Sequence, residues 1–384
     1  MNELALMVSN VFKENFSSVP HLFYSPGRIN FIGEHIDYND GYVMPSAIDK
    51  GIYYAIAPNK TDDINFISID FEEKFTVNIS DVKRMTGWKN YVLGVVNEFI
   101  LRELPVKGFD CAFGGNIADG AGISSSAAVE GGLAFGINEL FGFGLSRKEL
   151  ALLCQRAEHN FPGVMCGIMD QYANMFGKKD HVILLDTRSV SHAYFPLKLD
   201  GFEIVLINTK VHHSLASSEY NVRRKQCEEG LEILKKEIGV TSFRDIQNAD
   251  ELIPFKEEMG EEVYKRCKYV VEEIIRTQEA AKLLQENNIE AFGKMMFATH
   301  EGLSSLYEVS CKELDFLVEK ARENKDVIGS RMMGGGFGGC TINIIRKESV
   351  ETFLSGATTA YQNEFNLAAE VIRVEIGDGT HQIK

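Results

Sequence analysis

The sequence lacks the features that mark secreted, disulfide-bonded and membrane-spanning proteins. Its seven cysteines form no C-x-x-C pair, and an odd number of scattered cysteines is typical of reduced thiols. The N-terminus has no basic region ahead of an apolar core, so no signal peptide is expected. No apolar run reaches the length that a membrane-spanning helix needs. These absences predict a cytoplasmic protein with no membrane partner.

Positive charge is also scarce, because 40 Lys and Arg residues face 55 Asp and Glu residues and leave a net charge of -15. A nucleic-acid partner is therefore not expected, since binding nucleic acid requires a cationic surface. An anionic substrate would have to be bound by backbone N–H groups, a metal ion and a few cationic side chains. With 384 residues, 45% apolar and 25% charged, the chain has an ordinary globular composition and is long enough for two domains.

A stretch rich in glycine and serine, residues 116–130, precedes a segment with helical apolar spacing. Its serines lie where that helix should begin, and serine is a favoured N-cap. A helix N-terminus offers unpaired N–H groups, and glycines such as Gly120 and Gly122 let a phosphate approach the backbone. No lysine follows the glycines, so the stretch is not a Walker P-loop. It is either a capped helix or an anion site whose charge is balanced by a metal or by another part of the chain.

Residues 24–48 combine turn-forming residues with many polar side chains. The turn formers are Pro26, Gly27, Gly33, Gly41 and Pro45. The polar groups, which fall within ten residues, are Arg28, Glu34, His35 and Asp37. A loop with this set of donors and acceptors suits a polyhydroxylated ligand, whose hydroxyls both donate and accept. The alternative is a surface loop in which the charges satisfy one another.

The remaining chain alternates strand-like and helix-like patterns. Runs of β-branched and aromatic residues predict strands at 51–57, 64–69, 74–79, 109–113, 181–186 and 202–208. Helical patterns cover 3–16, 88–103, 146–160, 217–238, 241–325 and 347–363, the third opening with the capping box Ser146–Glu149. The strand at 202–208 is nearly all apolar and should be central in its sheet. The polar stretch 187–202 is the expected domain change, which gives domains 1–200 and 201–384.

The glycine-rich stretch 331–345 formally contains G-x-G-x-x-G at Gly334, Gly336 and Gly339. A strand-like run follows it instead of a helix, so the context of a dinucleotide-binding motif is missing. A glycine hairpin between two strands, followed by a helix and a strand at 369–376, predicts half of a ferredoxin-type split β-α-β unit.

Three further residues allow both a structural and a functional interpretation. Glu158 lies in the last turns of a helix, where the dipole disfavours a carboxylate and a neighbouring cation would compensate it. Asp170 falls in the first turn of a short helix, where the dipole stabilises it. Tyr220 lies near the start of a helix. Taken alone, these residues are a solvated glutamate, a helix-terminal acid and a half-buried tyrosine.

The run Gly27-Arg-Ile-Asn-Phe-Ile-Gly33-Glu-His-Ile-Asp-Tyr-Asn-Asp-Gly41 closely resembles the galactokinase signature. The stretch 120–126 resembles the ATP-binding loop of the wider group that includes homoserine, mevalonate and phosphomevalonate kinases. The resemblance covers essentially the whole chain. It implies an α+β, two-domain fold with an N-terminal α/β domain like ribosomal protein S5, a C-terminal ferredoxin-like domain and an active site between them. It implies ATP- and Mg²⁺-dependent phosphorylation of the C1 hydroxyl of D-galactose, and we expect a monomer.

The resemblance also implies individual roles. Asp170 would accept the proton of the sugar hydroxyl, and Arg28 would stabilise charge on the transferring group. The implied sugar-binding residues are Glu34, His35, Ile36, Asp37, Gly167 and Tyr220. The implied nucleotide-binding residues are Ser68, Gly120, Ala121, Gly122, Ile123, Ser124, Ser125 and Ser126. Ser126 and Glu158 would hold Mg²⁺. For Ser68 the strand pattern alone favours an exposed serine with no ligand.

Three other functions compete with galactose phosphorylation. One is a related kinase for N-acetylgalactosamine or another aldose. The sequence Asn39-Asp40-Gly41 favours galactose, although Ile36 stands where threonine is more usual. A second is a sensor that binds galactose and ATP without turnover, against which the intact catalytic and metal-binding residues count. The third, dinucleotide binding, depends only on the glycine pattern near the C-terminus.

Overall fold

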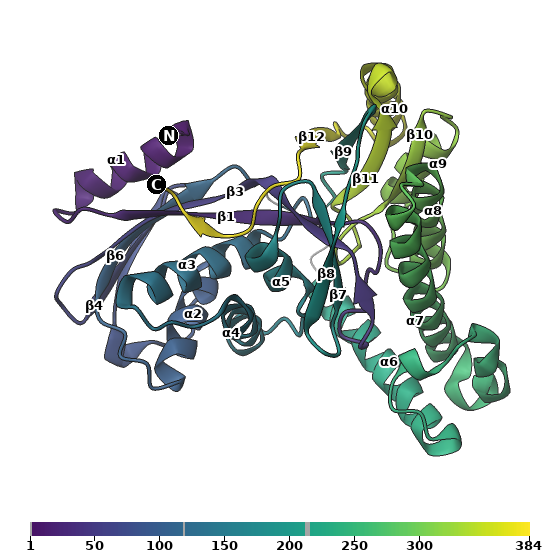
Figure 1. Cartoon of the computed structure of the whole chain (residues 1–384), viewed down its shortest axis with the longest axis horizontal. Coiled ribbons are helices and arrows are strands. Elements are labelled where there is room, and N and C mark those ends of the chain that lie inside the picture. The colour runs from purple at the N-terminus through teal and green to yellow at the C-terminus, as the bar shows by residue number, and fades with distance from the viewer. Residues whose placement is uncertain (1, 118–119, 212–215) are drawn as a thin grey trace.

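The computed structural model describes residues 2–117, 120–211 and 216–384, and its strands form three sheets. The six-stranded sheet has the order β13-β1-β3-β6-β4-β5, the four-stranded sheet β10-β11-β9-β12, and the three-stranded sheet β2-β7-β8. Figure 1 shows the six-stranded sheet with α1 to α5 on one side of the molecule and the four-stranded sheet with α7 to α10 on the other.

The strands are β1 (His21–Asn30), β2 (Tyr42–Val43), β3 (Pro45–Pro58), β4 (Asp63–Ser68), β5 (Glu73–Asn78), β6 (Phe109–Gly115), β7 (His181–Asp186), β8 (Ser191–Pro196), β9 (Phe202–Asn208), β10 (Val327–Met332), β11 (Cys340–Arg346), β12 (Glu370–Val374) and β13 (His381–Gln382). The helices are α1 (Glu3–Asn15), α2 (Lys89–Leu101), α3 (Ser125–Phe141), α4 (Arg147–Asn160), α5 (Met169–Phe176), α6 (Ala216–Ile238), α7 (Lys256–Gln285), α8 (Ile289–Ser305), α9 (Lys312–Arg322) and α10 (Val350–Phe365). Among the described residues, no helix is long and apolar enough to cross a membrane.

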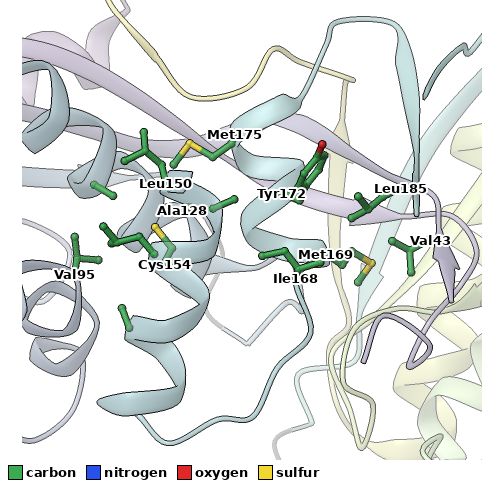
Figure 2. Packing of buried hydrophobic residues seen from close by; sticks show 14 of the residues in the cluster. Val43, Val95, Ala128, Leu150, Cys154, Ile168, Met169, Tyr172, Met175 and Leu185 are labelled. Atoms are coloured by element: carbon green, nitrogen blue, oxygen red, sulfur yellow. The ribbon is translucent and has the colours of Figure 1, made fainter. Parts of the chain in front are cut away.

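The six-stranded sheet is covered on both faces, which explains why β3 is buried almost throughout. Alternate residues of a strand point to opposite faces. Tyr53 and Ala55 pack in the cluster beneath α1, whereas Tyr54 and Ile56 join the main core beside α3. A Cβ at Gly132 of α3 would lie 2.2 Å from the Tyr54 ring, so glycine permits this close approach of helix and sheet. Figure 2 shows the main core continuing between α3, α4 and α5.

The four-stranded sheet has ferredoxin-like topology. Its neighbouring strands are all antiparallel, and α10 connects β11 to the edge strand β12. The central position predicted for 202–208 is confirmed, because β9 pairs with both β11 and β12. The glycine hairpin is also confirmed, since it joins β10 to β11. The last residues return to the other sheet, where β13 pairs with β1. The boundary at residue 200 stays a prediction.

Two expectations about local structure are wrong, and one strand, β8, was missed. Much of the 24–48 segment is strand and not loop, because a bulge between Pro26 and Arg28 keeps both residues in β1. The stretch 187–202 contains β8, a largely exposed edge strand whose polar sequence hides it. The segment 241–325 is not continuously helical, since α7, α8 and α9 are separated by turns at 286–288 and 306–311.

Candidate active site

A cavity of about 190 Å³, lined by several charged side chains, lies between the end of β1 and the hairpin that joins β10 to β11. It is lined by Arg28, Glu34, His35, Asp37, Glu158, Val164, Cys166, Gly167, Met169, Asp170, Tyr220, Gly334 and Gly335. Eight of these thirteen are residues to which the sequence assigned a role. They come from the end of β1, the loop after it, α4, the turn before α5, α5 itself, α6 and the glycine hairpin. Segments from both ends of the chain therefore build one site.

An arginine–aspartate pair forms one wall of this cavity. Arg28 Nε and Nη2 donate to Asp170 Oδ1 and Oδ2 at 2.7 and 2.8 Å, a bidentate arrangement. Nη1 of the same guanidinium donates to the carbonyl oxygen of Gly122 at 2.7 Å. Burial alone would lower the pKa of Arg28, but the charges of Asp170 and Glu34 raise it, so the guanidinium stays cationic. Arg28 thus joins the predicted base to the predicted nucleotide loop.

The glycine–serine loop ends at α3, as expected, but Ser124 does not cap that helix with its side chain. Ser124 occupies the N-cap position with φ of 60°, and its hydroxyl hydrogen-bonds to Asp170 instead. Gly120 and Gly122 also have left-handed backbone, with φ of 65° and 69°, which favours glycine. Gly122 lies against the hairpin, where a Cβ on it would be 3.1 Å from the carbonyl oxygen of Met333. In the same loop the side chains of Ala121 and Ile123 are buried in the core, so these two residues present their backbone to the site.

Glu158 is buried, so the alternative of a solvated surface glutamate is wrong. Its Oε2 accepts a 2.7 Å hydrogen bond from Gln171 Nε2. Burial and the charge of Asp170 raise the pKa of Glu158 to about 7. A cation beside Ser126 and Glu158 would offset both effects. The described residues hold no group of three or more His, Cys, Asp or Glu suited to a metal, so a cation here needs further oxygens from phosphate or water. That donor set fits Mg²⁺.

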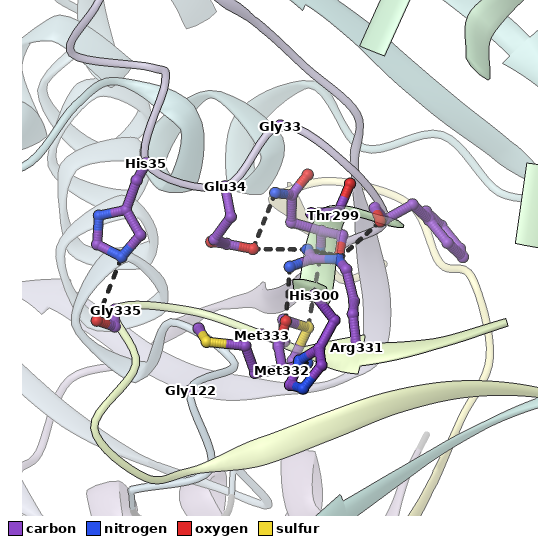
Figure 3. Close-up of polar contacts among 12 residues, drawn as sticks. Gly33, Glu34, His35, Gly122, Thr299, His300, Arg331, Met332, Met333 and Gly335 are labelled. Carbon is purple, nitrogen blue, oxygen red and sulfur yellow. Dashed lines mark hydrogen bonds and ion pairs between the residues drawn. The ribbon is translucent and has the colours of Figure 1, made fainter. Parts of the chain in front are cut away.

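The loop after β1 supplies four of the predicted sugar-binding residues, and Figure 3 shows two of them, Glu34 and His35. Glu34 Oε2 accepts hydrogen bonds from Arg331 Nη2 at 2.6 Å and Asn30 Nδ2 at 3.1 Å. Burial lowers the pKa of His35 to about 4, so its ring is neutral at pH 7. Burial and the charges of Asp170 and Glu34 raise the pKa of Asp37 to about 7.

The other predicted site residues, Gly167, Tyr220, Ile36 and Ser68, lie in different environments. A Cβ on Gly167 would lie 2.0 Å from Asp37 Oδ2, so only glycine fits there. The Tyr220 ring lies 5.1 Å from the His35 ring. The Ile36 side chain is buried in the main core and does not line the cavity. Ser68 is buried at the end of β4 with a hydroxyl that has no hydrogen-bond partner, so the expectation of an exposed serine is wrong.

Sequence reasoning missed the residues that hold the loop after β1 (residues 31–41, called the sugar loop below) from the other side. Glu273 Oε1 accepts a hydrogen bond from Gly33 N at 2.8 Å, and Tyr269 Oη donates to the carbonyl of Glu34 at 2.9 Å. Arg331 is fully buried and donates to the carbonyl of Phe31 as well as to Glu34. An arginine within the apolar pattern of β10 was the one available signal.

A pair of stacked aromatic rings near the end of β6 was also missed. The rings of Phe71 and Trp88 are parallel to within 2°, with centroids 5.7 Å apart, and Phe71 is 59% exposed. Trp88 also packs edge-on against Phe113 of β6, the strand that leads to the glycine–serine loop. An exposed aromatic face beside this loop can stack on a planar base.

We expect Asp37→Asn to stabilise the ligand-free protein at pH 8 by on the order of 2–4 kcal/mol. The folded state raises the Asp37 pKa to about 7, so the folded protein binds more protons than the unfolded chain between about pH 4 and pH 7. Stability contributed by this group is therefore present below pH 4 and is lost as the pH rises through 7. Urea unfolding at pH 5 and pH 8 measures the difference.

The exposed Asp62 provides the matched control, because Asp62→Asn makes the same chemical change without altering a buried group. Asp62→Asn should leave the urea unfolding curves at pH 5 and pH 8 unchanged. A wild type and Asp37→Asn variant with parallel pH dependence would contradict the buried-carboxyl interpretation.

Three segments of the chain match family models. Residues 10–58 match the galactokinase galactose-binding signature. Residues 90–178 match the GHMP kinases N terminal domain, and residues 280–363 match the GHMP kinases C terminal model. The segments contain the sugar loop, the glycine–serine loop with α4 and α5, and the glycine hairpin, respectively.

Complete proteins are similar over nearly the whole length. The galactokinase of Thermotoga maritima is 40% identical over 359 residues, which are 94% of this chain and 99% of that protein. The galactokinase of Clostridium acetobutylicum is 38% identical over 389 residues, covering 100% of this chain and 99% of that protein. The structure of Lactococcus lactis galactokinase complexed with galactose gives a TM-score of 0.95 at 31% identity, with 98% of this chain and 99% of that chain covered. Methanococcus jannaschii mevalonate kinase, at a TM-score of 0.64 and 18% identity, shares the two-domain fold; 93% of this chain and 99% of that chain are covered.

Proposed function

This chain belongs to the galactokinase family, and on that premise we propose how its cavity binds galactose, ATP and Mg²⁺. The protein is an ATP-dependent sugar kinase that converts D-galactose and ATP into galactose 1-phosphate and ADP. The anomeric oxygen forms a bond to the γ-phosphorus while the bond to the bridging oxygen of ADP breaks. One observation carries the assignment of the reacting centre, namely the guanidinium of Arg28 that joins Asp170 to Gly122.

At this centre Asp170 accepts the proton of the sugar hydroxyl. Its carboxylate can accept this proton because it lines the cavity and is about one quarter exposed. Phosphoryl transfer passes through a loose transition state, so positioning and charge stabilisation contribute more than deprotonation. Arg28, fixed between Asp170 and the glycine–serine loop, stabilises negative charge on the transferring group.

Galactose is held by the loop after β1. Glu34 and Asp37 accept hydrogen bonds from sugar hydroxyls, and the neutral His35 and Tyr220 complete the polar wall. Gly167 has no Cβ and therefore leaves room for the Asp37 carboxylate. Ile36 contributes through its backbone and through packing of the loop.

ATP is held by residues 120–126 and the N-terminus of α3. Free N–H groups at that helix end and the positive end of its dipole favour the phosphates. The stacked pair Phe71 and Trp88, which packs against Phe113 of β6, offers a place for the base, and the unpaired hydroxyl of Ser68 is the nearby polar group. Ser126 and Glu158 would hold Mg²⁺, which would supply charge neutralisation for the phosphates.

The function is tested by coupled ADP release with galactose, N-acetylgalactosamine, glucose, arabinose and mevalonate as acceptors. Galactose should give the highest kcat/KM. Turnover on another aldose only would replace the substrate, and binding of galactose and ATP without ADP release would indicate a sensor.

Glu158→Gln should raise the Mg²⁺ concentration for half-maximal activity at least about 10-fold. Even the mutation of a residue that only hydrogen-bonds to a metal ligand weakens metal binding by this much. The change keeps the size of the side chain but removes the charge that the cation would offset. Titration of MgCl₂ at fixed ATP measures it. The exposed Glu139→Gln on α3 is the matched control and should not move the curve. An unchanged Mg²⁺ requirement in Glu158→Gln would remove this residue from the metal site.

A further inference from the structure

We infer that Tyr38, Tyr307 and Cys227, none of which reacts, hold His35 as the Nε2–H tautomer so that it donates a hydrogen bond to a galactose oxygen. The ligand half of this inference rests on the proposed function, whereas the tautomer is a property of the free protein. These three are positioning residues for a sugar-binding histidine.

The proton on Nε2 follows from the partner of that nitrogen. His35 Nε2 lies 3.3 Å from the carbonyl oxygen of Gly335, and a carbonyl oxygen only accepts. Nε2 must therefore carry the hydrogen. Because burial keeps the ring neutral at pH 7, the other nitrogen is bare and accepts. Its partner is the hydroxyl of Tyr38, 2.8 Å from Nδ1, which must donate.

The direction of this hydrogen bond passes along a chain of buried groups. Tyr38 has one hydroxyl proton and gives it to His35, so its oxygen accepts from the hydroxyl of Tyr307 at 2.9 Å. The oxygen of Tyr307 in turn accepts from the thiol of Cys227 at 3.2 Å. Burial raises the pKa of both tyrosines well above its ordinary value and that of Cys227 to about 11. All three groups keep their protons at neutral pH, so the chain has a single direction.

Two neighbouring aromatic rings also fix the direction in which the His35 ring points. The ring of Tyr307 lies 5.1 Å from the His35 ring, and Tyr220 packs at the same distance. Nε2 faces the hairpin at Gly335, which also lines the cavity. The 3.3 Å separation is long for a hydrogen bond of this type, so a ligand oxygen that enters the cavity can accept the Nε2 proton instead.

This assignment gives the cavity two kinds of wall. Glu34 and Asp37 accept hydrogen bonds when ionised, whereas His35 donates. A sugar position that faces His35 must therefore carry an acceptor, and a position that faces either carboxylate must carry a donor. Fluorine accepts weakly and cannot donate, so replacing each hydroxyl other than the reacting C1 hydroxyl, in turn, by hydrogen or by fluorine separates the two cases.

The tautomer is tested by ¹⁵N NMR of the imidazole nitrogens in the full chain without ligand. We expect a protonated Nε2 and a bare, hydrogen-bonded Nδ1 for His35. In Tyr38→Phe the Nδ1 signal should move to that of a bare nitrogen without a partner. Tyr361→Phe is the control, because it removes a tyrosine hydroxyl that is bonded elsewhere, to the carbonyl of Thr209. A proton on Nδ1 in the wild type, or an Nδ1 signal that Tyr38→Phe leaves in place, would overturn the inference.

The donor role is tested with deoxy- and deoxyfluorogalactoses in the ADP-release assay. At one ring position the fluoro sugar should keep a kcat/KM about twofold or more above that of the deoxy sugar, the lower end of the range for one neutral hydrogen bond, because fluorine accepts weakly. Tyr38→Phe should abolish that difference and raise KM for galactose with little change in kcat. Tyr307→Phe breaks the hydrogen-bond chain one step further from His35. It should reduce the fluoro–deoxy difference in kcat/KM without abolishing it.

Each failure points to a different error. A merely structural role for Tyr38 would lower Tm but leave the fluoro–deoxy difference intact, which contradicts the inference. Absence of turnover on galactose would contradict the proposed function and leave the NMR result standing. Turnover on galactose with an Nδ1–H tautomer would contradict the inference alone.

Discussion

Asp170→Asn is expected to lower kcat for galactose by about 10³-fold, within the range for loss of a positioned general base. The carboxylate accepts two hydrogen bonds from Arg28 and one from Ser124, and an amide has a single acceptor oxygen. The variant therefore loses both the proton acceptor and part of the arrangement that fixes Arg28. Single-turnover ADP release at saturating galactose measures the chemical step directly.

Arg28→Lys separates the two contributions in this prediction. Lysine keeps the charge but not the planar fork that contacts both Asp170 oxygens and Gly122 at once. We expect a smaller fall in kcat than for Asp170→Asn, with galactose binding by calorimetry preserved in both variants. A kcat within tenfold of the wild type for Asp170→Asn would exclude this carboxylate as the base.

The parts of the site that were predictable lie close together in the sequence. Arg28, Glu34, His35 and Asp37 fall within one short run, and the glycine–serine loop directly precedes a helix with clear apolar spacing. The ferredoxin-like unit was predictable for the same reason, because its hairpin, helix and last strand follow one another along the chain.

The contacts that hold the sugar loop were not predictable, since they join distant parts of the chain. Arg331 is 297 residues from Glu34, and Glu273 is 240 residues from Gly33. No local pattern specifies which buried arginine meets which carboxylate. The same limit applies to Tyr307, which contacts Tyr38 across 269 residues of chain, and to Cys227, which contacts Tyr307.

Two errors arose from signals that were present in the sequence. Ser68 is four residues after Ile64 and two after Phe66, so the alternation of β4 places it on their buried face. Pro26 and Gly27 indicated a turn, but a bulge absorbs such residues within a strand. Alternation was the more reliable rule at Ser68. At Pro26 only the pairing of β1 with β3 decides between strand and turn.

The buried pair Arg331–Glu34 leads to the largest expected effect on stability. Arg331→Met should lower the free energy of unfolding by about 3–5 kcal/mol, because it leaves a buried carboxylate without its partner. Burial opposes ionisation of Glu34, but Arg331 and Arg28 hold its pKa below the ordinary value, so the group remains charged in the folded protein. Urea unfolding at pH 7 measures the loss. Arg346→Met is the control and should cost no more than about 1 kcal/mol, since its pair with Glu290 is exposed.

The double variant Arg331→Met/Glu34→Gln shows what this pair contributes. If the cost of Arg331→Met arises from an unpaired charge, neutralising Glu34 should recover most of it, and the double variant should be more stable than Arg331→Met. Recovery of stability should not restore activity, because the orientation of Glu34 toward galactose would still be lost. A double variant as unstable as the sum of the two single variants would mean that Arg331 acts through its bonds to Phe31 and Met332 instead. The pair would then position the sugar loop without charge complementarity.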